Sequence, residues 1–156
     1  MSKIIYANNN GIKHEANVPD AIAQSDLKNG YLVLLGIDEN GKHTATLPAS
    51  ADDCKKELRF VWNTIEKPEL LSENDYFVAK GAPARLFRFM HDCPVYVSPD
   101  LVSGTVAIGK KLIPDEANFG KLKESATVDG YKVILQVTDV LTKVNGKLYL
   151  CELVDA

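Results

Sequence analysis

The sequence predicts an all-β fold, a mainly antiparallel sandwich or barrel with one or two short helical turns and an N-terminal arm. The first observation is a series of strand-like runs, cut by Gly, Pro and Asp at intervals of about eight to ten residues. These runs are YFVA, ARLFRF, PVYVS and TVAIGKKLI, between residues 71 and 114. The second observation is two Asn-Gly dipeptides, each between apolar runs, which strongly indicate β-hairpins.

The length of 156 residues fits one domain, and we expect an arm over residues 1–19 followed by a single β-rich domain over 20–156. The formal net charge of −3 disfavours nucleic acid as the main partner, because a phosphate-binding surface needs a surplus of Lys and Arg. Arg85, Arg88, Lys110 and Lys111 are interpreted as the solvated outer faces of strands.

Neither a membrane nor an oxidising compartment is expected. The N-terminus is too polar for the apolar core of a signal peptide, and the longest apolar run is only strand-sized. The three cysteines are an odd number without a CxxC pair, which favours free thiols that fill the core. We therefore expect the protein to be made and kept in a cytoplasm, or to be released from it by lysis.

The N-terminal segment contains a small apolar group, Ile4, Ile5 and Tyr6, followed by a turn cluster at residues 8–11. It is expected to be an arm that adds to a neighbouring sheet or lies in a groove. An ordinary edge strand with a frayed tip is the alternative. Residues 20–24 are expected to form one helical turn, before a turn at 26–30.

Two hairpins are predicted. In the first, Tyr31–Ile37 is a strand buried on both faces, Asn40-Gly41 makes a type I′ turn, and residues 42–47 return. In the second, residues 131–141 place Tyr131, Val133, Leu135 and Val137 on one face, Asn145-Gly146 turns, and residues 147–154 return. Residues 114–130 between the two halves of the chain are expected to be a surface loop.

The segment from 49 to 67 supports two interpretations. Its apolar residues recur at helical spacing, and Ser50 followed three residues later by Asp53 is typical of a helix start. Residues 58–62 are also rich in aromatic and branched side chains, as a strand would be. The local pattern leaves both open, and residues 68–71 are expected to begin a second short helical segment.

No catalytic, cofactor-binding or metal-binding residue is assigned from the sequence. His91 and Cys93 are the one close pair of soft metal ligands, and they are interpreted as part of a turn before a strand at 95–97. Gly104 and Gly109 fit no phosphate-binding loop. Trp62 is expected in the core, with an aromatic platform as the alternative.

The runs DLKNGYLVLLG, ELRFVWNTIEKPEL, NDYFVAKGAPARLFRF, PVYVSPDLV and GTVAIGKKLIP together resemble a family of small structural proteins of tailed bacteriophages. These are capsid decoration, or head auxiliary, proteins. The resemblance covers about residues 20–154 and implies that residues 58–62 form a strand. It departs from the family pattern at residues 91–94, where a Lys-Gly-Asp-like turn is expected.

The resemblance implies a non-enzymatic virion protein that binds the outer surface of the assembled capsid and needs no cofactor. Its expected partner is the major capsid protein, with homo-oligomers possible and no nucleic acid or membrane involved. The candidate contact residues lie in the arm: Ile4, Ile5, Tyr6 and Ile12. The alternatives are a ligand- or glycan-binding β-module that uses Trp62, and a small hydrolase or metal protein that uses His91 and Cys93.

Overall fold

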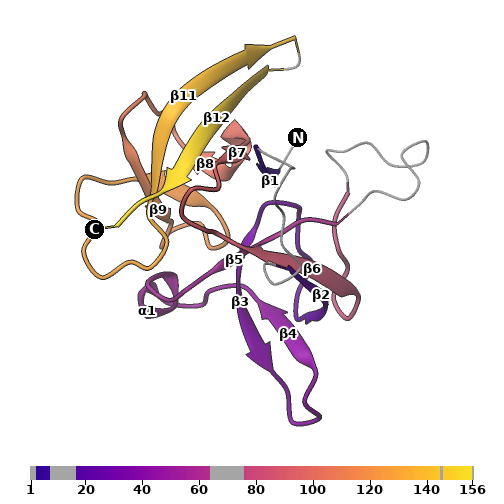
Figure 1. The fold of residues 1–156 in the computed structure, drawn as a ribbon. Coiled ribbons are helices and arrows are strands. Elements are labelled where there is room, and N and C mark those ends of the chain that lie inside the picture. Colours follow the sequence, from indigo (N-terminus) through magenta and orange to yellow (C-terminus); the bar gives the residue numbers. More distant parts are fainter. Residues whose placement is uncertain (1–2, 8–16, 64–75, 145, 156) are drawn as a thin grey trace.

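The computed structural model describes residues 3–7, 17–63, 76–144 and 146–155, and it confirms the all-β fold. The strands form two sheets, one of which closes into a five-stranded barrel (Figure 1). Ile12 and the helical segment predicted at residues 68–71 lie outside the described residues.

The barrel uses strands from residues 17–88. They follow one another around the barrel as β2 (Asn17–Ala23), β4 (His43–Thr46), β3 (Leu32–Ile37), β5 (Arg59–Val61) and β6 (Pro83–Arg88). All neighbours are antiparallel except β2 and β4. Small side chains fill much of the interior: Ala21, Ala23, Ala45 and Ala84. A barrel of so few strands is filled by side chains alone, and here the alanines leave room for larger residues such as Val33, Val61 and Leu86.

The second sheet has seven strands. Their order is β1 (Ile4–Tyr6), β7 (Val95–Val97), β12 (Gly146–Leu153), β11 (Leu135–Lys143), β9 (Lys111–Pro114), β10 (Leu122–Glu124) and β8 (Val102–Ser103). Neighbours are antiparallel except β8 and β10. A short 3₁₀ helix, η3 (Pro99–Leu101), lies between β7 and β8. The chain therefore enters this sheet at β1, builds the barrel, and returns to complete the sheet.

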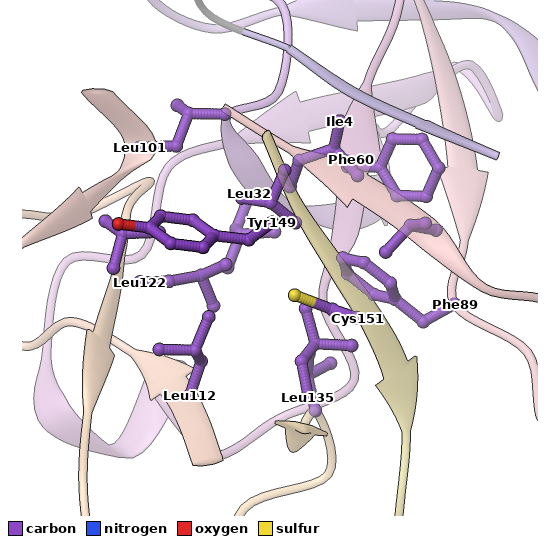
Figure 2. Close-up of a cluster of buried hydrophobic side chains, with 14 of the residues drawn as sticks. Ile4, Leu32, Phe60, Phe89, Leu101, Leu112, Leu122, Leu135, Tyr149 and Cys151 are labelled. Carbon is purple, nitrogen blue, oxygen red and sulfur yellow. The ribbon is translucent and has the colours of Figure 1, made fainter. Parts of the chain in front are cut away.

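One hydrophobic core joins the barrel to the sheet (Figure 2). Because side chains alternate along a strand, neighbouring residues of β5 serve different cores: Phe60 lies in the shared core and Val61 in the barrel interior. Phe60 stacks on Phe87 of β6, with ring centroids 5.7 Å apart. Leu135 and Cys151 of the sheet are fully buried in the same core.

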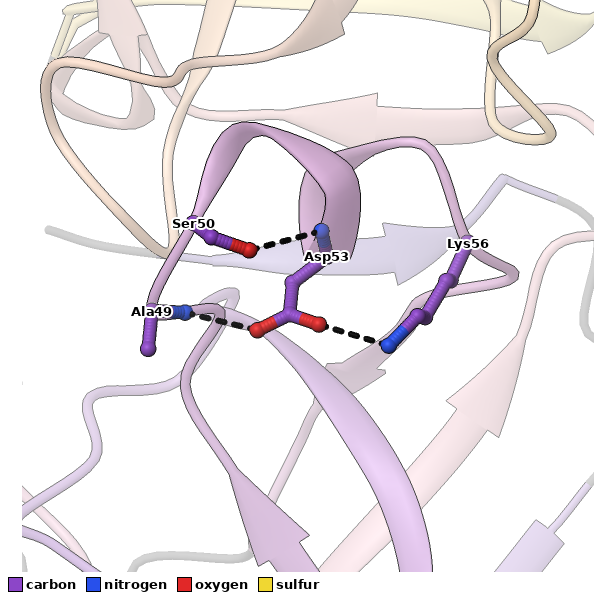
Figure 3. Close-up of polar contacts among 4 residues, drawn as sticks. All are labelled: Ala49, Ser50, Asp53 and Lys56. Atoms are coloured by element: carbon purple, nitrogen blue, oxygen red, sulfur yellow. Dashed lines mark hydrogen bonds and ion pairs between the residues drawn. The ribbon is translucent and has the colours of Figure 1, made fainter.

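The segment from 49 to 67 contains both structures that its pattern suggested. Helix α1 (Ala51–Cys54) begins at Ser50, whose hydroxyl accepts a 3.2 Å hydrogen bond from the Asp53 amide (Figure 3). The Asp53 carboxylate in turn accepts hydrogen bonds from the Ala49 amide at 3.1 Å and from Lys56 at 2.7 Å. The strand expected over 58–62 follows as β5, so the short helix and the strand divide the segment between them.

The helical turn predicted at residues 20–24 was wrong. These residues belong largely to β2, which pairs with β6 on one side and β4 on the other. A shift of register between Val18 and Ala21 accommodates Pro19, because a proline cannot donate to the ladder. The boundary predicted between arm and domain at residue 19 falls inside this barrel strand.

Both predicted hairpins form, but their turns differ from the prediction. Gly41 has a φ of +78° whereas Asn40 does not have a positive φ, so the turn is not type I′. The Gly41 amide instead donates to the Asp38 carbonyl, and the Asp38 carboxylate accepts from the Asn40 and Lys42 amides. At the far end of β3, Ile37 is 69% exposed, so that strand is not buried throughout.

The second hairpin also turns at a different place. Gly146 pairs with Lys143 and is the first residue of β12, and Asn145 lies outside the described residues. Val133, Leu135 and Val137 share the main core as predicted. Tyr131 does not join them, because it packs on a smaller cluster of Ile113, Val128 and Ile134.

Two further expectations need correction. Residues 114–130 are not simply a surface loop, because they contain β10, whose Leu122 is fully buried. The run TVAIGKKLI is a strand only from Lys111 onward, since turns with positive φ at Gly104 and Gly109 precede it. Of the run YFVA, Val78 forms an isolated bridge with Leu27.

Candidate protein-binding surface

Of the predicted contact residues, Ile4, Ile5 and Tyr6 form β1, an edge strand of the chain's own sheet. β1 pairs with β7, and Ile4 and Tyr6 face the core, with exposed fractions of 0% and 6%. The Tyr6 hydroxyl donates a 2.6 Å hydrogen bond to the Arg88 carbonyl, and its burial raises its pKa to about 12. Ile5, opposite Tyr96, is half-buried, and it is the one of these three residues left partly accessible.

The β11–β12 hairpin extends beyond the sheet and projects from the body of the molecule (Figure 1). β9 pairs with β11 only at Leu135 and Gln136, and β7 pairs with β12 only from Tyr149 to Cys151. Residues 141–143 and 146–148 therefore pair only with each other in the described part of the chain. We call these two segments, with Val144 between them, the ribbon.

The base of the ribbon is anchored. A register shift between Val137 and Asp139 interrupts the ladder with β12, and such bulges increase strand twist. The Thr138 hydroxyl donates a 3.2 Å hydrogen bond to the Leu150 carbonyl, across the two strands. Val140 packs against the main core. The ribbon thus leaves the sheet from a well-held base, and at its tip the Val144 side chain is fully exposed.

A groove of about 760 Å³ lies between the ribbon and the segment that leads from β7 into η3. Three lysines contribute to its lining: Lys3 from the N-terminal segment, and Lys143 and Lys147 from the ribbon. The floor is held in place by two hydrogen bonds between backbone segments. The Lys3 amide donates to the Ser98 hydroxyl at 2.8 Å, and the Ser98 amide donates to the Lys3 carbonyl at 3.0 Å.

A second, smaller hollow of about 470 Å³ lies where the end of β6 meets the end of β12. Arg88 forms a 3.3 Å ion pair with Glu57, and His91 lies 3.4 Å from Asp155. All four side chains are substantially exposed, so these ion pairs are weak. The hollow is lined by charges of both signs, the paired Glu57 and Arg88 and, in addition, Lys132.

His91 and Cys93 are not brought together with further ligands. In the described residues, no group of three or more His, Cys, Asp or Glu side chains could hold a metal ion. Asp92 between them has a φ of +61°, which makes the turn that was expected before the strand at 95–97. Cys93 is half-buried, and burial raises the pKa of its thiol.

The other cysteines pack in the interior as expected. Cys54 and Cys151 are fully buried, and all three thiols are free. Burial raises the pKa of Cys151 to about 12. Burial also raises the pKa of Cys54, with a further contribution from the Glu116 carboxylate. These thiols therefore stay protonated and act as small apolar side chains.

Trp62 does not form an exposed aromatic platform. Its side chain is half-buried and packs against the main core, beside β6. Its backbone amide donates a 3.0 Å hydrogen bond to the Arg85 carbonyl, which extends the β5–β6 pairing by one residue. Trp62 therefore lies at the edge of the core rather than inside it, where it had been expected.

Comparisons of the chain with protein-family models, with curated proteins and with solved structures find no match. No helix in the described residues is long and apolar enough to cross a membrane. The ribbon and its groove had no signal in the sequence beyond the Asn145-Gly146 dipeptide. How far the ribbon extends beyond the sheet depends on which strands pair with β11 and β12. The sequence of the hairpin does not specify those partners.

Proposed function

We propose that this protein is a structural component of a tailed-bacteriophage virion that binds the outer surface of the assembled capsid and decorates or stabilises it. The proposed partner is the major capsid protein. The proposal starts from the sequence resemblance, which covers most of the chain. On this proposal, the protein is synthesised in the host cytoplasm and then binds to the capsid.

The projecting ribbon is the structural observation that supports this function best. A two-stranded ribbon is marginally stable alone, and here it emerges from a sheet whose base is buried in the shared core. It carries a fully exposed Val144 between Lys143 and the return strand. An exposed apolar side chain at the tip of a ribbon with a buried base is a suitable contact for a neighbouring protein.

Because a capsid is a lattice of identical subunits, a weak contact by each copy of the protein is sufficient for stable binding. If each copy binds weakly, copies that also touch one another or span two subunits gain affinity from effective concentration. β1 is an outer strand of the seven-stranded sheet, but its edge away from β7 is closed to a second copy, because Ile4 is fully buried and Gly30 lies against the Ile4 amide. The possible homo-oligomer therefore has to use another surface.

Co-sedimentation with capsids that lack the protein tests the proposal. Capsids from the phage that encodes this chain are mixed with increasing amounts of purified protein and pelleted. We expect binding that saturates at a fixed ratio to the major capsid protein, with little binding to unassembled subunits. Soluble, folded protein that stays in the supernatant at all concentrations would contradict the function.

A further inference from the structure

We propose that the groove beside the ribbon binds an extended, acidic segment of the partner protein. The inference deepens the proposed function and rests on it for the identity of the partner as a capsid protein. The nature of the ligand rests on the groove alone. Three features of the groove point to it: its charge, its apolar walls and an unpaired strand edge.

The charge of the groove is opposite in sign to that of the whole chain. Lys3, Lys143 and Lys147 contribute to it, although the chain carries a formal net charge of −3. None of the three forms an ion pair with another described residue, whereas Lys56 and Lys110 do. Among the described lining residues, Asp100 is the acidic one. A ligand with carboxylates is therefore complementary to this surface.

The walls between the lysines are apolar. Pro99 of η3 lies on one side, and Leu148 and Val144 of the ribbon lie on the other. The ligand must therefore carry apolar side chains between its carboxylates. A volume of about 760 Å³ lies within the range of about 300–1,000 Å³ that ligand sites occupy.

The unpaired backbone edge of β12 beside the groove favours a ligand in an extended conformation. β7 pairs with β12 as far as Tyr149, opposite Val97, and then turns away at Ser98 into η3. In the described chain, β12 has no neighbour on this side from Gly146 to Leu148. An added strand that continues the line of β7 can pair with these residues, as in recognition by β-augmentation.

The lining favours a peptide over a nucleic acid. The described residues that line the groove include neither an arginine nor an aromatic side chain. Single-stranded nucleic acids are usually held by stacking of bases on aromatic rings, and phosphates are bound best by larger sets of cations. Three lysines and apolar walls instead match alternating acidic and apolar residues on one strand.

Fluorescence anisotropy with a fluorescein-labelled peptide of alternating Glu and Val residues tests the ligand class. The same peptide with Gln in place of Glu is the ligand control. The variant is the double charge reversal Lys143→Glu/Lys147→Glu. Its matched control is Lys42→Glu/Lys80→Glu, which makes the same change of net charge at two exposed lysines outside the groove.

We expect the wild-type protein and the Lys42/Lys80 variant to bind the Glu peptide equally. The Lys143/Lys147 variant and the Gln peptide should each weaken binding by about tenfold. Circular dichroism melting curves verify that both variants are folded. Equal weakening by the two variants, or no preference for Glu over Gln, overturns the groove assignment. Tighter binding of a labelled oligonucleotide, lost in the Lys143/Lys147 variant, also overturns it.

The capsid assay separates this inference from the proposed function. If the wild-type protein binds the Glu peptide through the groove but does not bind capsids, the groove is supported and the function fails. If the wild-type protein binds capsids and the Lys143→Glu/Lys147→Glu variant binds them equally well, the function stands and the groove is not the capsid contact. Loss of capsid binding in that variant alone supports both.

Discussion

The Ser103 hydroxyl donates a 2.6 Å hydrogen bond to the carboxylate of Asp115, which is only 3% exposed. Asn118 and the Ala117 amide also donate to this carboxylate, at 3.0 and 2.9 Å. Burial opposes ionisation of Asp115, but the combined hydrogen bonds outweigh it and hold its pKa below the usual value. Because Ser103 belongs to β8 and Asp115 follows β9, the pair ties the outer strands of the sheet together.

Replacing Ser103 with Ala should lower the free energy of unfolding by about 1.5–3 kcal/mol at neutral pH, the usual contribution of a hydrogen bond to a charged group. Urea unfolding followed by circular dichroism measures this loss. Ser125→Ala is a suitable comparison, because the Ser125 hydroxyl contacts only the nearby Thr127 backbone on an exposed segment. A loss as large in that variant would mean that the Asp115 contact is not special.

The stability contributed by Asp115 should depend on pH. Its pKa is lower in the folded state, so this contribution is present above the unfolded-state value of about 4 and disappears as the pH falls through the folded-state pKa. Asp115→Asn should therefore be less stable than wild type at neutral pH, and the gap should shrink towards about pH 2. Urea unfolding across this range measures it, and a constant gap would contradict the assignment.

Gly30 should tolerate no side chain. Its φ is +87°, and an added Cβ would lie 2.3 Å from a methyl carbon of Leu101 and 3.0 Å from the Ile4 amide nitrogen. Gly30→Ala should cost about 2–5 kcal/mol through backbone strain and the displacement of Leu101 or β1. Gly41→Ala shares the positive φ but meets nothing within 4 Å, so it should cost only about 1–2 kcal/mol.

Thermal unfolding of the two glycine variants measures this difference. A common loss of stability would show that the backbone conformation alone matters. A larger loss for Gly30→Ala shows that the close contact with Leu101 and β1 contributes as well.

The three thiols should react with Ellman's reagent in two classes. Cys54 and Cys151 are fully buried, and burial raises the pKa of Cys151 to about 12, so both should react only after unfolding. Cys93 is half-buried and should react first in the folded protein, although slowly, because burial raises its pKa as well. Mass spectrometry of the labelled peptides identifies the sites. Early labelling of Cys151 would contradict its place in the shared core.

Val144→Asp should weaken capsid binding without loss of stability. The side chain is fully exposed, so the free energy of unfolding should change by no more than about 0.5 kcal/mol. Ile108→Asp is the matched control, since Ile108 is also a large exposed apolar side chain, at 60%, but lies outside the ribbon. Co-sedimentation with capsids should decrease for the first variant and not for the second. Equal binding by both would place the contact elsewhere.

The sequence predicted both hairpins because their strands are close in the chain, but it missed the type of the first turn and the position of the second. It misjudged residues 20–24, where pairing with two distant strands overrides the weak local preference for a helix. It also read Ile4 and Tyr6 as available for a partner, since apolar residues beside a polar turn cluster look alike whether they pack internally or externally. The groove could not be predicted from the sequence, because Lys3 and Lys147 line it together only through the β1–β7–β12 pairing.

The placement of Phe60 and Val61 on opposite sides of one strand has a consequence for how the chain can be divided. The barrel wall also covers one face of the seven-stranded sheet. That sheet is completed by β1, which comes from the first residues of the chain. A fragment ending at Met90, just after β6, would expose the aromatic face of Phe60, Phe87 and Phe89 to water. A fragment beginning at β7 would lack its first strand. The protein should therefore melt in a single cooperative transition, and neither half should be recoverable as a soluble piece.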